Sequence, residues 1–150
     1  TLVKSSAASD VYKRQVQLLY PSMGKMMAKK VGADDAWMVQ DGYVTEGTSN
    51  NAYIIKNNKI VTRGLSNDIL HGITRAAVLR FAKEAQMQVE ERNFTLDEAY
   101  EADEAFITSA STFVMPVIEI DGNKIGQGVP GSNSSRLREI YLEESKKLAI

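Results

Sequence analysis

The sequence contains no cysteine and a single histidine among its 150 residues. The lack of cysteine excludes disulfide bonds, thiolate nucleophiles and cysteine-based zinc sites, and one histidine cannot supply a histidine-rich metal site. Lysine and arginine number 18 against 19 acidic residues. There is therefore no basic excess of the kind that indicates a nucleic-acid partner.

Long apolar segments are also missing. No run approaches the roughly 20 residues of a membrane-spanning helix, and the first residues lack the apolar core of a signal peptide. We therefore expect a cytoplasmic protein with no membrane partner. The length fits one domain with a substantial core, and a charged fraction of 25% is ordinary for a globular protein.

An acidic residue stands between two stretches of strand character. Asp41-Gly42 indicates a tight turn, because glycine accepts the positive φ of hairpin turns. A β-rich run begins at Tyr43, residues 51–55 resume one, and Glu46 lies between them. Two interpretations stay open: Glu46 is an ordinary carboxylate at a solvated sheet edge, or it is held inward to pair with a cationic or protonated group.

Two motifs carry a resemblance to a known family. Residues 46–51 read EGTSNN, and residues 71–75 read HGITR. In this order they resemble the class IV, pyridoxal-phosphate-dependent aminotransferases, which include D-amino acid, branched-chain amino acid and aminodeoxychorismate enzymes. The resemblance runs from about Val16 to the C-terminus. Through residues 18–20 (LLY) and 48–50 (TSN) it is closest to the D-amino acid aminotransferases.

The resemblance implies a fold, a cofactor and a reaction. The fold would be the larger C-terminal domain of that family, an α/β domain with antiparallel-rich mixed sheets in a pseudo-barrel, packed with helices. The cofactor would be pyridoxal 5′-phosphate. The parent protein, a homodimer, would move an amino group between an amino acid, D- or branched-chain, and a 2-oxo acid. Alternatives are an aminodeoxychorismate lyase-type enzyme and a catalytically dead domain that retains the fold.

The resemblance also assigns cofactor contacts. Glu46 would lie beside the pyridine nitrogen and keep it protonated, because a nearby opposite charge favours the charged form. The phosphate would bind at the start of a helix, where backbone amides and the helix dipole favour an anion. The predicted cofactor-binding residues are Glu46, Ser49, Leu70, Gly72, Ile73, Thr74, Ser109 and Ala110.

Several of these assignments have alternatives. Gly72 to Thr74 also match a plain helix start, and Leu70, expected against one ring face, also fits an ordinary core leucine. Several family members have threonine where this chain has Ala110, so Ser109, Ser111 or backbone amides would have to replace that hydroxyl. Arg75 is expected in a surface or structural ion pair.

The residue that should bind the cofactor covalently is missing. Family members carry a lysine three residues before the position of Gln17, and this chain has Arg14 there. Arginine is not the amine nucleophile that a Schiff base requires. Lys13 is one residue away, which on a strand is the opposite face, and Lys25 and Lys29 fit solvated helix positions.

We therefore expect no intact catalytic residue and no turnover by this chain. Residues 1–15 do not resemble the family and are interpreted as a non-native or mis-read leader, with a genuine divergent leader as the alternative. Residues 16–150 would form the cofactor-binding domain, and the family's smaller N-terminal domain would be missing.

Periodicity predicts the remaining elements. Residues 16–20 would form a strand, followed by a helix capped by Ser22 and ended by Gly32. On that helix Met23, Met26 and Met27 share one face, a pattern typical of core packing. Residues 36–62 would form a small antiparallel meander, with turns at residues 40–42 and 57–58.

The second half alternates helices and strands. A helix from Gly72 to about Gln88 would pack on the meander through an apolar stripe that ends at Val89. Strand segments are predicted at 88–94, 105–108 and 114–120. Residues 95–98 (TLDE) predict a capping box, and a last helix would begin at Ser132 or Ser134.

Overall fold

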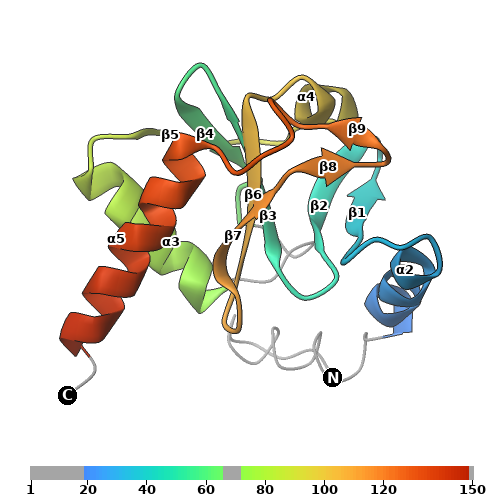
Figure 1. Ribbon diagram of the computed structural model, residues 1–150, viewed down its shortest axis with the longest axis horizontal. Helices are drawn as coiled ribbons and strands as arrows, with labels where there is room; N and C mark the ends of the chain where they lie inside the picture. Colours follow the sequence, from blue (N-terminus) through green and yellow to red (C-terminus); the bar gives the residue numbers. More distant parts are fainter. Residues whose placement is uncertain (1–18, 66–71, 149–150) are drawn as a thin grey trace.

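The computed structural model describes residues 19–65 and 72–148, and its centre is a five-stranded sheet in the order β5-β4-β3-β6-β7 (Figure 1). Strands β4 and β5 are parallel, and the other neighbouring strands are antiparallel. The mixed, antiparallel-rich α/β fold predicted from the sequence is confirmed. The five strands are β3 (Asn51–Lys56), β4 (Lys59–Thr62), β5 (Gln88–Glu91), β6 (Glu104–Ser109) and β7 (Phe113–Val117).

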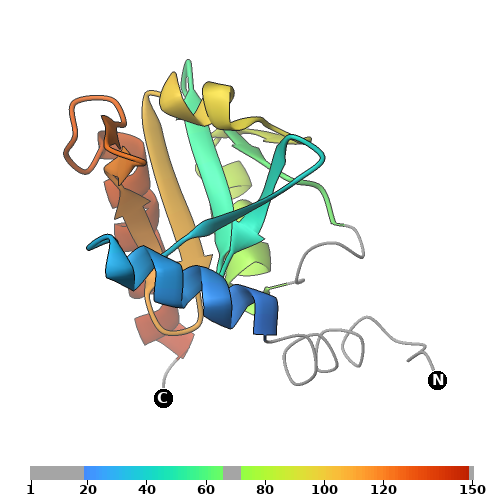
Figure 2. The same cartoon turned by 90° about the vertical axis from the view of Figure 1, so that its right-hand side faces the viewer.

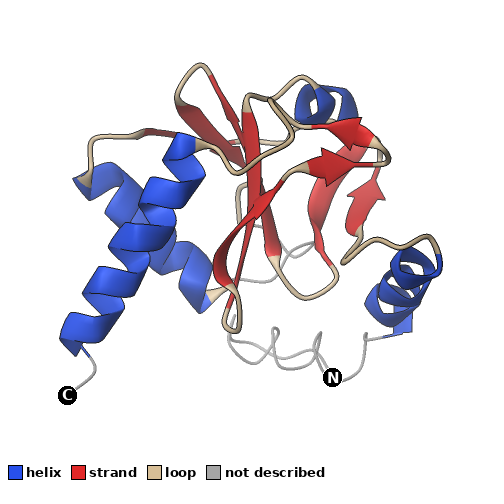
Figure 3. Ribbon diagram, in the orientation of Figure 1, coloured by secondary structure: helices blue, strands red, loops and turns tan. Residues whose placement is uncertain are grey.

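Smaller elements cover both faces of this sheet (Figure 3). Helices α3 and α5 pack on one face, while the β1–β2 hairpin, α4 and the β8–β9 hairpin lie over the other. The helices are α2 (Leu19–Lys30), α3 (Ile73–Glu84), α4 (Leu96–Tyr100) and α5 (Ser132–Leu148). The two hairpins consist of β1 (Trp37–Gln40) with β2 (Tyr43–Gly47), and β8 (Glu119–Ile120) with β9 (Asn123–Lys124).

Alternation along β3 explains why both faces are apolar. Ala52 and Ile54 join the core under the hairpins, whereas Tyr53 and Ile55 join the core under the helices. Successive strand residues point to opposite faces, so this run of buried residues is apolar on both sides. The strand is therefore fixed in the middle of the domain, and its first residue, Asn51, stands at one end of the sheet.

The buried Tyr53 links the core to that end of the sheet. Its ring stacks on Phe106, its neighbour on β6, with centroids 4.4 Å apart and planes 5° apart. Its hydroxyl forms a 2.8 Å hydrogen bond with the hydroxyl of Thr108. Burial raises the pKa of Tyr53 well above its usual value, and the bond to Thr108 and the charge of Arg75 offset this only partly.

The first described element differs from the prediction. Leu19 and Tyr20 belong to helix α2, so the predicted strand at 16–20 is wrong at these two residues, and Ser22 lies inside the helix instead of capping it. A short apolar run does not distinguish a strand from a helix. The predicted end is confirmed: Gly32 has φ +79 and donates its N–H to Lys29 O at 3.1 Å, a glycine C-cap.

The methionine stripe of α2 is not core. Met23, Met26 and Met27 are 51%, 62% and 65% exposed. The helix packs instead through Gly24, where an added β-carbon would lie 3.3 Å from Met38 Sδ, and through the buried Ala28. Figure 2 shows α2 lying across one end of the β1–β2 hairpin. Periodicity identified the apolar face correctly, but it could not show whether another element covers that face.

Both predicted hairpin turns are confirmed, but the predicted meander is wrong. Asn57 and Asn58 have φ of 50 and 60, and Asp41 and Gly42 also have positive φ, as tight two-residue turns require. However, β1 and β2 form their own sheet, separate from β3 and β4. A sharp corner in the chain, closed by the bond from Gly47 N to Asn50 O (2.9 Å), separates the two hairpins.

In the second half the element types are confirmed and several boundaries are wrong. Helix α3 ends at Glu84, and Val89 lies on β5 instead of on the helix. Strand β5 stops at Glu91, and the predicted strand 114–120 is divided into β7 and β8. The capping box at the start of α4 is confirmed, as is the start of α5 at Ser132.

Candidate functional site

Helix α3 begins with a backbone anion-binding geometry. Gly72 is its N-cap residue, with φ −62 and ψ 134, and makes no side-chain capping bond. The first amides of a helix have no intrahelical partner and lie at the positive end of its dipole. Thr74, in this first turn, is 3% exposed, whereas Ile73 is 83% exposed. The segment therefore offers amides and a nearby hydroxyl to an anion.

The turn between β6 and β7 is rich in hydroxyl groups. Ser109 Oγ lies 2.7 Å from Thr112 Oγ1 and 3.3 Å from Ser111 Oγ, and it accepts a 3.0 Å hydrogen bond from Thr112 N. Ala110 and Ser111 are exposed at the tip. Hydroxyls therefore remain in this turn even though residue 110 has none, as the proposed replacement of the threonine requires.

The helix start and the hydroxyl turn meet at the first residue of β3. Asn51 pairs with Thr108, which directly precedes Ser109. On its other side Asn51 contacts the start of α3, because a β-carbon on Gly72 would lie 2.4 Å from Asn51 Oδ1. Figures 1 and 2 show the start of α3, the β6–β7 turn and the β2–β3 corner at the same end of the sheet.

Glu46 and Ser49 belong to the β2–β3 corner at this end. Glu46 is half-buried on β2, between the buried Thr45 and Gly47, where the β1–β2 register shifts and β2 has one extra residue. Its side chain is therefore only partly exposed at this end of the domain. Ser49 is exposed in the turn.

Asp35 fixes the shape of this corner, a role that no sequence pattern indicated. Its carboxylate accepts hydrogen bonds from Thr48 Oγ1 and Asn50 Nδ2, which lie 13 and 15 residues further along the chain. A side chain at Gly47 would displace the Asn50 amide from this position, because an added β-carbon would lie 2.0 Å from Asn50 Oδ1. No local pattern connects residues at such separations, so periodicity could not identify the contact.

Arg75 has the structural role expected of it. Its side chain is 4% exposed and forms a 2.8 Å ion pair with Glu91 on β5. It also donates to the carbonyl of Arg63 at 2.9 Å. The interactions join the first turn of α3 to the sheet, which fixes where the amides of that turn lie.

The structure does not test every predicted residue. Leu70 and His71, as well as Lys13 and Arg14, lie outside the described residues. Lys25 and Lys29 are exposed on α2, as expected for solvated charges. Within residues 19–65 and 72–148 no three His, Cys, Asp or Glu side chains form a potential metal site, and no helix is long and apolar enough to cross a membrane.

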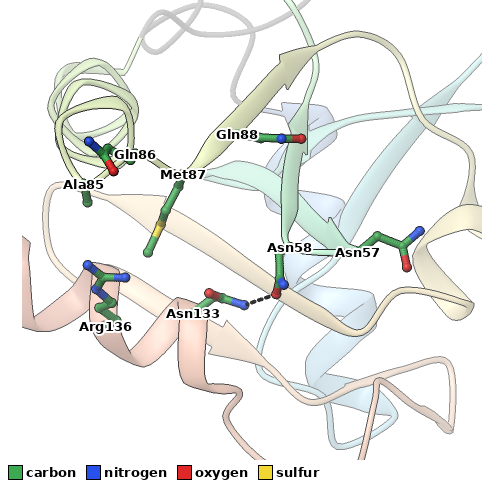
Figure 4. Close-up of a pocket in the computed structure, with 8 residues that line it drawn as sticks. All are labelled: Asn57, Asn58, Ala85, Gln86, Met87, Gln88, Asn133 and Arg136. Carbon is green, nitrogen blue, oxygen red and sulfur yellow. Dashed lines mark hydrogen bonds between the residues drawn. The ribbon is translucent and has the colours of Figure 1, made fainter.

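A separate pocket of about 490 Å³ lies at the opposite end of the sheet (Figure 4). It is formed by the β3–β4 turn, the end of α3 and the first turns of α5. Most of its lining side chains are carboxamides, and none of them belongs to the predicted cofactor set. The lining residues are Asn57, Asn58, Ala85, Gln86, Met87, Gln88, Asn133 and Arg136.

Comparison with known proteins identifies the family. The family model described as "Amino-transferase class IV" matches residues 7–120. The chain belongs to the class IV aminotransferases. The resemblance seen in the two motifs is therefore confirmed.

The curated relatives include both D-alanine aminotransferases and branched-chain-amino-acid aminotransferases. A D-alanine aminotransferase of Bacillus licheniformis is 46% identical over 138 residues, which cover 89% of this chain and 49% of the relative. A putative branched-chain-amino-acid aminotransferase of Methanocaldococcus jannaschii is 36% identical, covering 91% and 48%. The chain thus spans about half the length of the curated relatives it matches.

Solved structures give the same fold. A T.th. branched-chain amino acid aminotransferase, complexed with N-(5′-phosphopyridoxyl)-L-glutamate, has a TM-score of 0.81 and 38% identity, covering 84% of this chain and 43% of that one. A branched-chain aminotransferase from Thermobaculum terrenum, in its PLP form, has a TM-score of 0.82 and 31% identity, covering 86% and 43%. The described fold is therefore that of part of a class IV aminotransferase.

Proposed function

We propose that this chain is the pyridoxal-phosphate-binding part of a class IV aminotransferase. The observation that carries the proposal is the meeting of the α3 N-terminus and the β6–β7 hydroxyl turn beside Asn51. Class IV membership supports it, as does the phosphopyridoxyl group in one of the matched structures. The proposed contacts are Glu46, Ser49, Leu70, Gly72, Ile73, Thr74, Ser109 and Ala110.

The residues present fit the phosphate of this cofactor. The first turn of α3 supplies amides, and the glycine N-cap leaves the approach to them free of a side chain. Ser109 and Ser111 add hydroxyls from the neighbouring turn. Thr74 and Ser109 would therefore bind phosphate oxygens together with the amides of Ile73 and Ala110.

Glu46 fits the opposite end of the cofactor. A half-buried carboxylate at this end of β2 can hold a proton on a pyridine nitrogen. When bound, the cofactor supplies the electron sink for removal of the proton from the substrate's Cα. The role of Glu46 is to keep the ring cationic. The Asp35 contacts to Thr48 and Asn50 keep the corner that carries Glu46 in place.

We further propose that the chain as given has no turnover, because Arg14 occupies the position of the Schiff-base lysine. A lysine there would act as nucleophile and would also move the proton at Cα. The parent protein would transfer an amino group between a D- or branched-chain amino acid and a 2-oxo acid, in the cytoplasm and as a homodimer. The same proposal treats residues 1–15 as a non-native leader. It also gives the parent protein a smaller N-terminal domain.

Cofactor binding by this chain can be tested by titration with pyridoxal 5′-phosphate and with pyridoxal, which lacks the phosphate. The unchanged chain should prefer the phosphorylated form. Thr74→Val and Ser109→Ala should each reduce that preference by about tenfold, the effect of one hydrogen bond to a charged group. Ser22→Ala, at an exposed position on α2, is the matched control. Equal affinity for the two ligands in the unchanged chain would refute the phosphate site.

Covalent chemistry needs a second experiment. In a full-length protein with a related N-terminal domain supplied and residues 16–150 unchanged, Arg14→Lys should give a borohydride-reducible adduct at position 14. Adduct formation on Lys13 or Lys25 would show that the assigned register is wrong. Turnover by the unchanged chain would contradict the assignment of Arg14.

The remaining alternatives give different results in the same full-length protein. An aminodeoxychorismate lyase-type enzyme would release pyruvate without needing a 2-oxo acid acceptor. A domain without catalytic function would bind the cofactor and give no turnover even with lysine at position 14. Membership of the class IV aminotransferases favours the aminotransferase.

A further inference from the structure

Helix α5 contains none of the proposed cofactor contacts, yet one of its side chains forms hydrogen bonds to the β6–β7 turn, which contains Ser109. Arg138 donates from Nη1 to the carbonyl of Thr112 at 2.9 Å and to the carbonyl of Val114 at 2.6 Å. β7 is an edge strand of the sheet. Arg138 thus holds the beginning of β7 from α5.

The segment between the two carbonyls has a strained backbone. Phe113 has φ +60, a conformation that is rare for a bulky side chain. Such a residue keeps this conformation only where its surroundings over-determine it. Here Arg138 binds the carbonyls of the residues before and after Phe113. The ring of Tyr141 stacks on the Phe113 ring, with centroids 5.4 Å apart. Arg138 and Tyr141 both belong to α5 and lie about one helical turn apart.

Thr112 passes this constraint on to the hydroxyl turn. Its carbonyl accepts from Arg138, and its amide donates to Ser109 Oγ at 3.0 Å. Its hydroxyl also contacts Ser109 Oγ at 2.7 Å. The position of Ser109 Oγ is therefore coupled to Arg138 through a single residue.

We propose that Arg138 is a positioning residue for phosphate binding, an inference that rests on the proposed function of the β6–β7 turn. By fixing Thr112 and the strained Phe113, Arg138 sets the direction in which the Ser109 hydroxyl and the amides at the turn tip face the phosphate. It touches neither the phosphate nor the reacting atoms. The α3 N-terminus binds the phosphate independently of Arg138.

A titration with inorganic phosphate, measured by the amide chemical shifts of the isotope-labelled chain, distinguishes the two halves of the site. These halves are the N-terminus of α3 and the β6–β7 turn. In the unchanged chain, phosphate should shift the amides of Ile73 and Thr74 together with those of Ala110 and Ser111. In Arg138→Gln the α3 amides should still shift, while the turn amides should lose their response. The preference for pyridoxal 5′-phosphate over pyridoxal should fall by about tenfold.

Two further variants make the test specific. Arg138→Lys keeps a donor that reaches one carbonyl, so it should give an intermediate preference. Arg136→Gln removes an exposed arginine on the same helix, at the far pocket, and should behave as the unchanged chain. If Arg138→Gln does not fold, a reduced turn response in Arg138→Lys supports the proposal, and a full response overturns it.

The outcomes separate this inference from the function it rests on. If Ser109→Ala lowers the phosphate preference and Arg138→Gln does not, the phosphate site stands and the role of Arg138 is refuted. If Arg138→Gln reduces the phosphate response of the α3 amides and of the turn amides equally, and also weakens pyridoxal binding, the role of Arg138 is general and structural. That result would also refute its proposed positioning role. If phosphate shifts neither set in the unchanged chain, the proposed function fails and this inference fails with it.

Discussion

Asn51 and Gly72 are packed so closely that the second residue has no room for a side chain: a β-carbon on Gly72 would lie 2.4 Å from Asn51 Oδ1. Asn51 is 5% exposed, so its amide cannot move aside freely. We expect Gly72→Ala to lower the free energy of unfolding by about 1–2 kcal/mol, the cost of an overpacked site, and to weaken phosphate binding. Urea unfolding and phosphate titration measure the two effects.

Gly64 provides the matched control for this substitution. An added β-carbon there meets nothing within 4 Å, and alanine reduces the conformational freedom of the unfolded chain. Gly64→Ala should therefore leave stability unchanged or slightly higher. A similar loss in both variants would show that contact with Asn51 is not the cause.

Gln86 occupies a position where glycine would be more stable. At the end of α3 it has φ +59, and it donates its N–H to Lys83 O at 3.0 Å. The end of α2 has the same arrangement with Gly32. Because left-handed backbone costs a residue with a β-carbon about 1 kcal/mol, Gln86→Gly should raise the free energy of unfolding by roughly 0.5–1 kcal/mol. Gly32→Ala should lower it by a similar amount, and a destabilised Gln86→Gly would contradict the argument.

Glu104 caps helix α5 from a strand nearly 30 residues away. Its carboxylate accepts from the backbone amides of Asn133 and Ser134 at 3.0 and 2.9 Å, and from the Ser134 hydroxyl at 2.8 Å. Asn133 Nδ2 is a fourth donor at 3.1 Å, and removing a charged acceptor from these four donors should cost about 2 kcal/mol of stability in Glu104→Ala. Glu139→Ala, exposed on the same helix, should change stability by less than about 0.5 kcal/mol. Denaturant unfolding that ranks the two variants equally would rule out this capping role.

Glu98 should make a small contribution that depends on pH. Partial burial acts to raise the pKa of Glu98, but the bond from Thr95 N and the pairing with Arg92 outweigh it, so this pKa lies below its ordinary value. A carboxyl group with a lowered folded-state pKa stabilises the protein above the unfolded value of about 4.3. That stability is lost as the pH falls through the folded value.

Glu98→Gln keeps the capping geometry and removes the titration. Because the Glu98 side chain is 39% exposed, solvent screening limits its contribution to roughly 0.5 kcal/mol. The variant should be less stable than the unchanged chain at pH 7 and equally stable near pH 3, as measured by urea unfolding. The same difference at both pH values would show that the charge of Glu98 is not responsible.

Local patterns predicted those features of the fold that depend on neighbouring residues. The capping box joins Thr95 to Glu98 within one helical turn, and the Asn57-Asn58 turn closes a hairpin between adjacent strands. Both were readable from the sequence because the interacting groups are at most a few residues apart. The Glu104 cap and the Asp35 contacts join distant segments, so no periodic pattern contains them.

The candidate site divides in the same way. The start of α3 near Gly72 was predicted by its motif and confirmed as a helix N-terminus. The bonds by which Arg138 holds the β6–β7 turn were not predicted, because arginine on a helix is usually a solvated charge. The roles of Glu46, Ser49 and the turn residues stay predictions. The meander failed because alternation identifies strands but does not specify which sheet they join.

The three methionines of α2 have a chemical consequence that follows from their exposure. Methionines that are 51–65% exposed are open to peroxide. Met115 is less exposed, at 41%, and Met38 and Met87 are half-buried. Mild oxidation should therefore produce sulfoxides at Met23, Met26 and Met27 first and leave the sheet folded. The rates at these three positions, followed by mass spectrometry, would serve as a footprint of α2. Any molecule or domain that covers the helix would slow oxidation there without changing it at Met87, which packs in the core under the other helices.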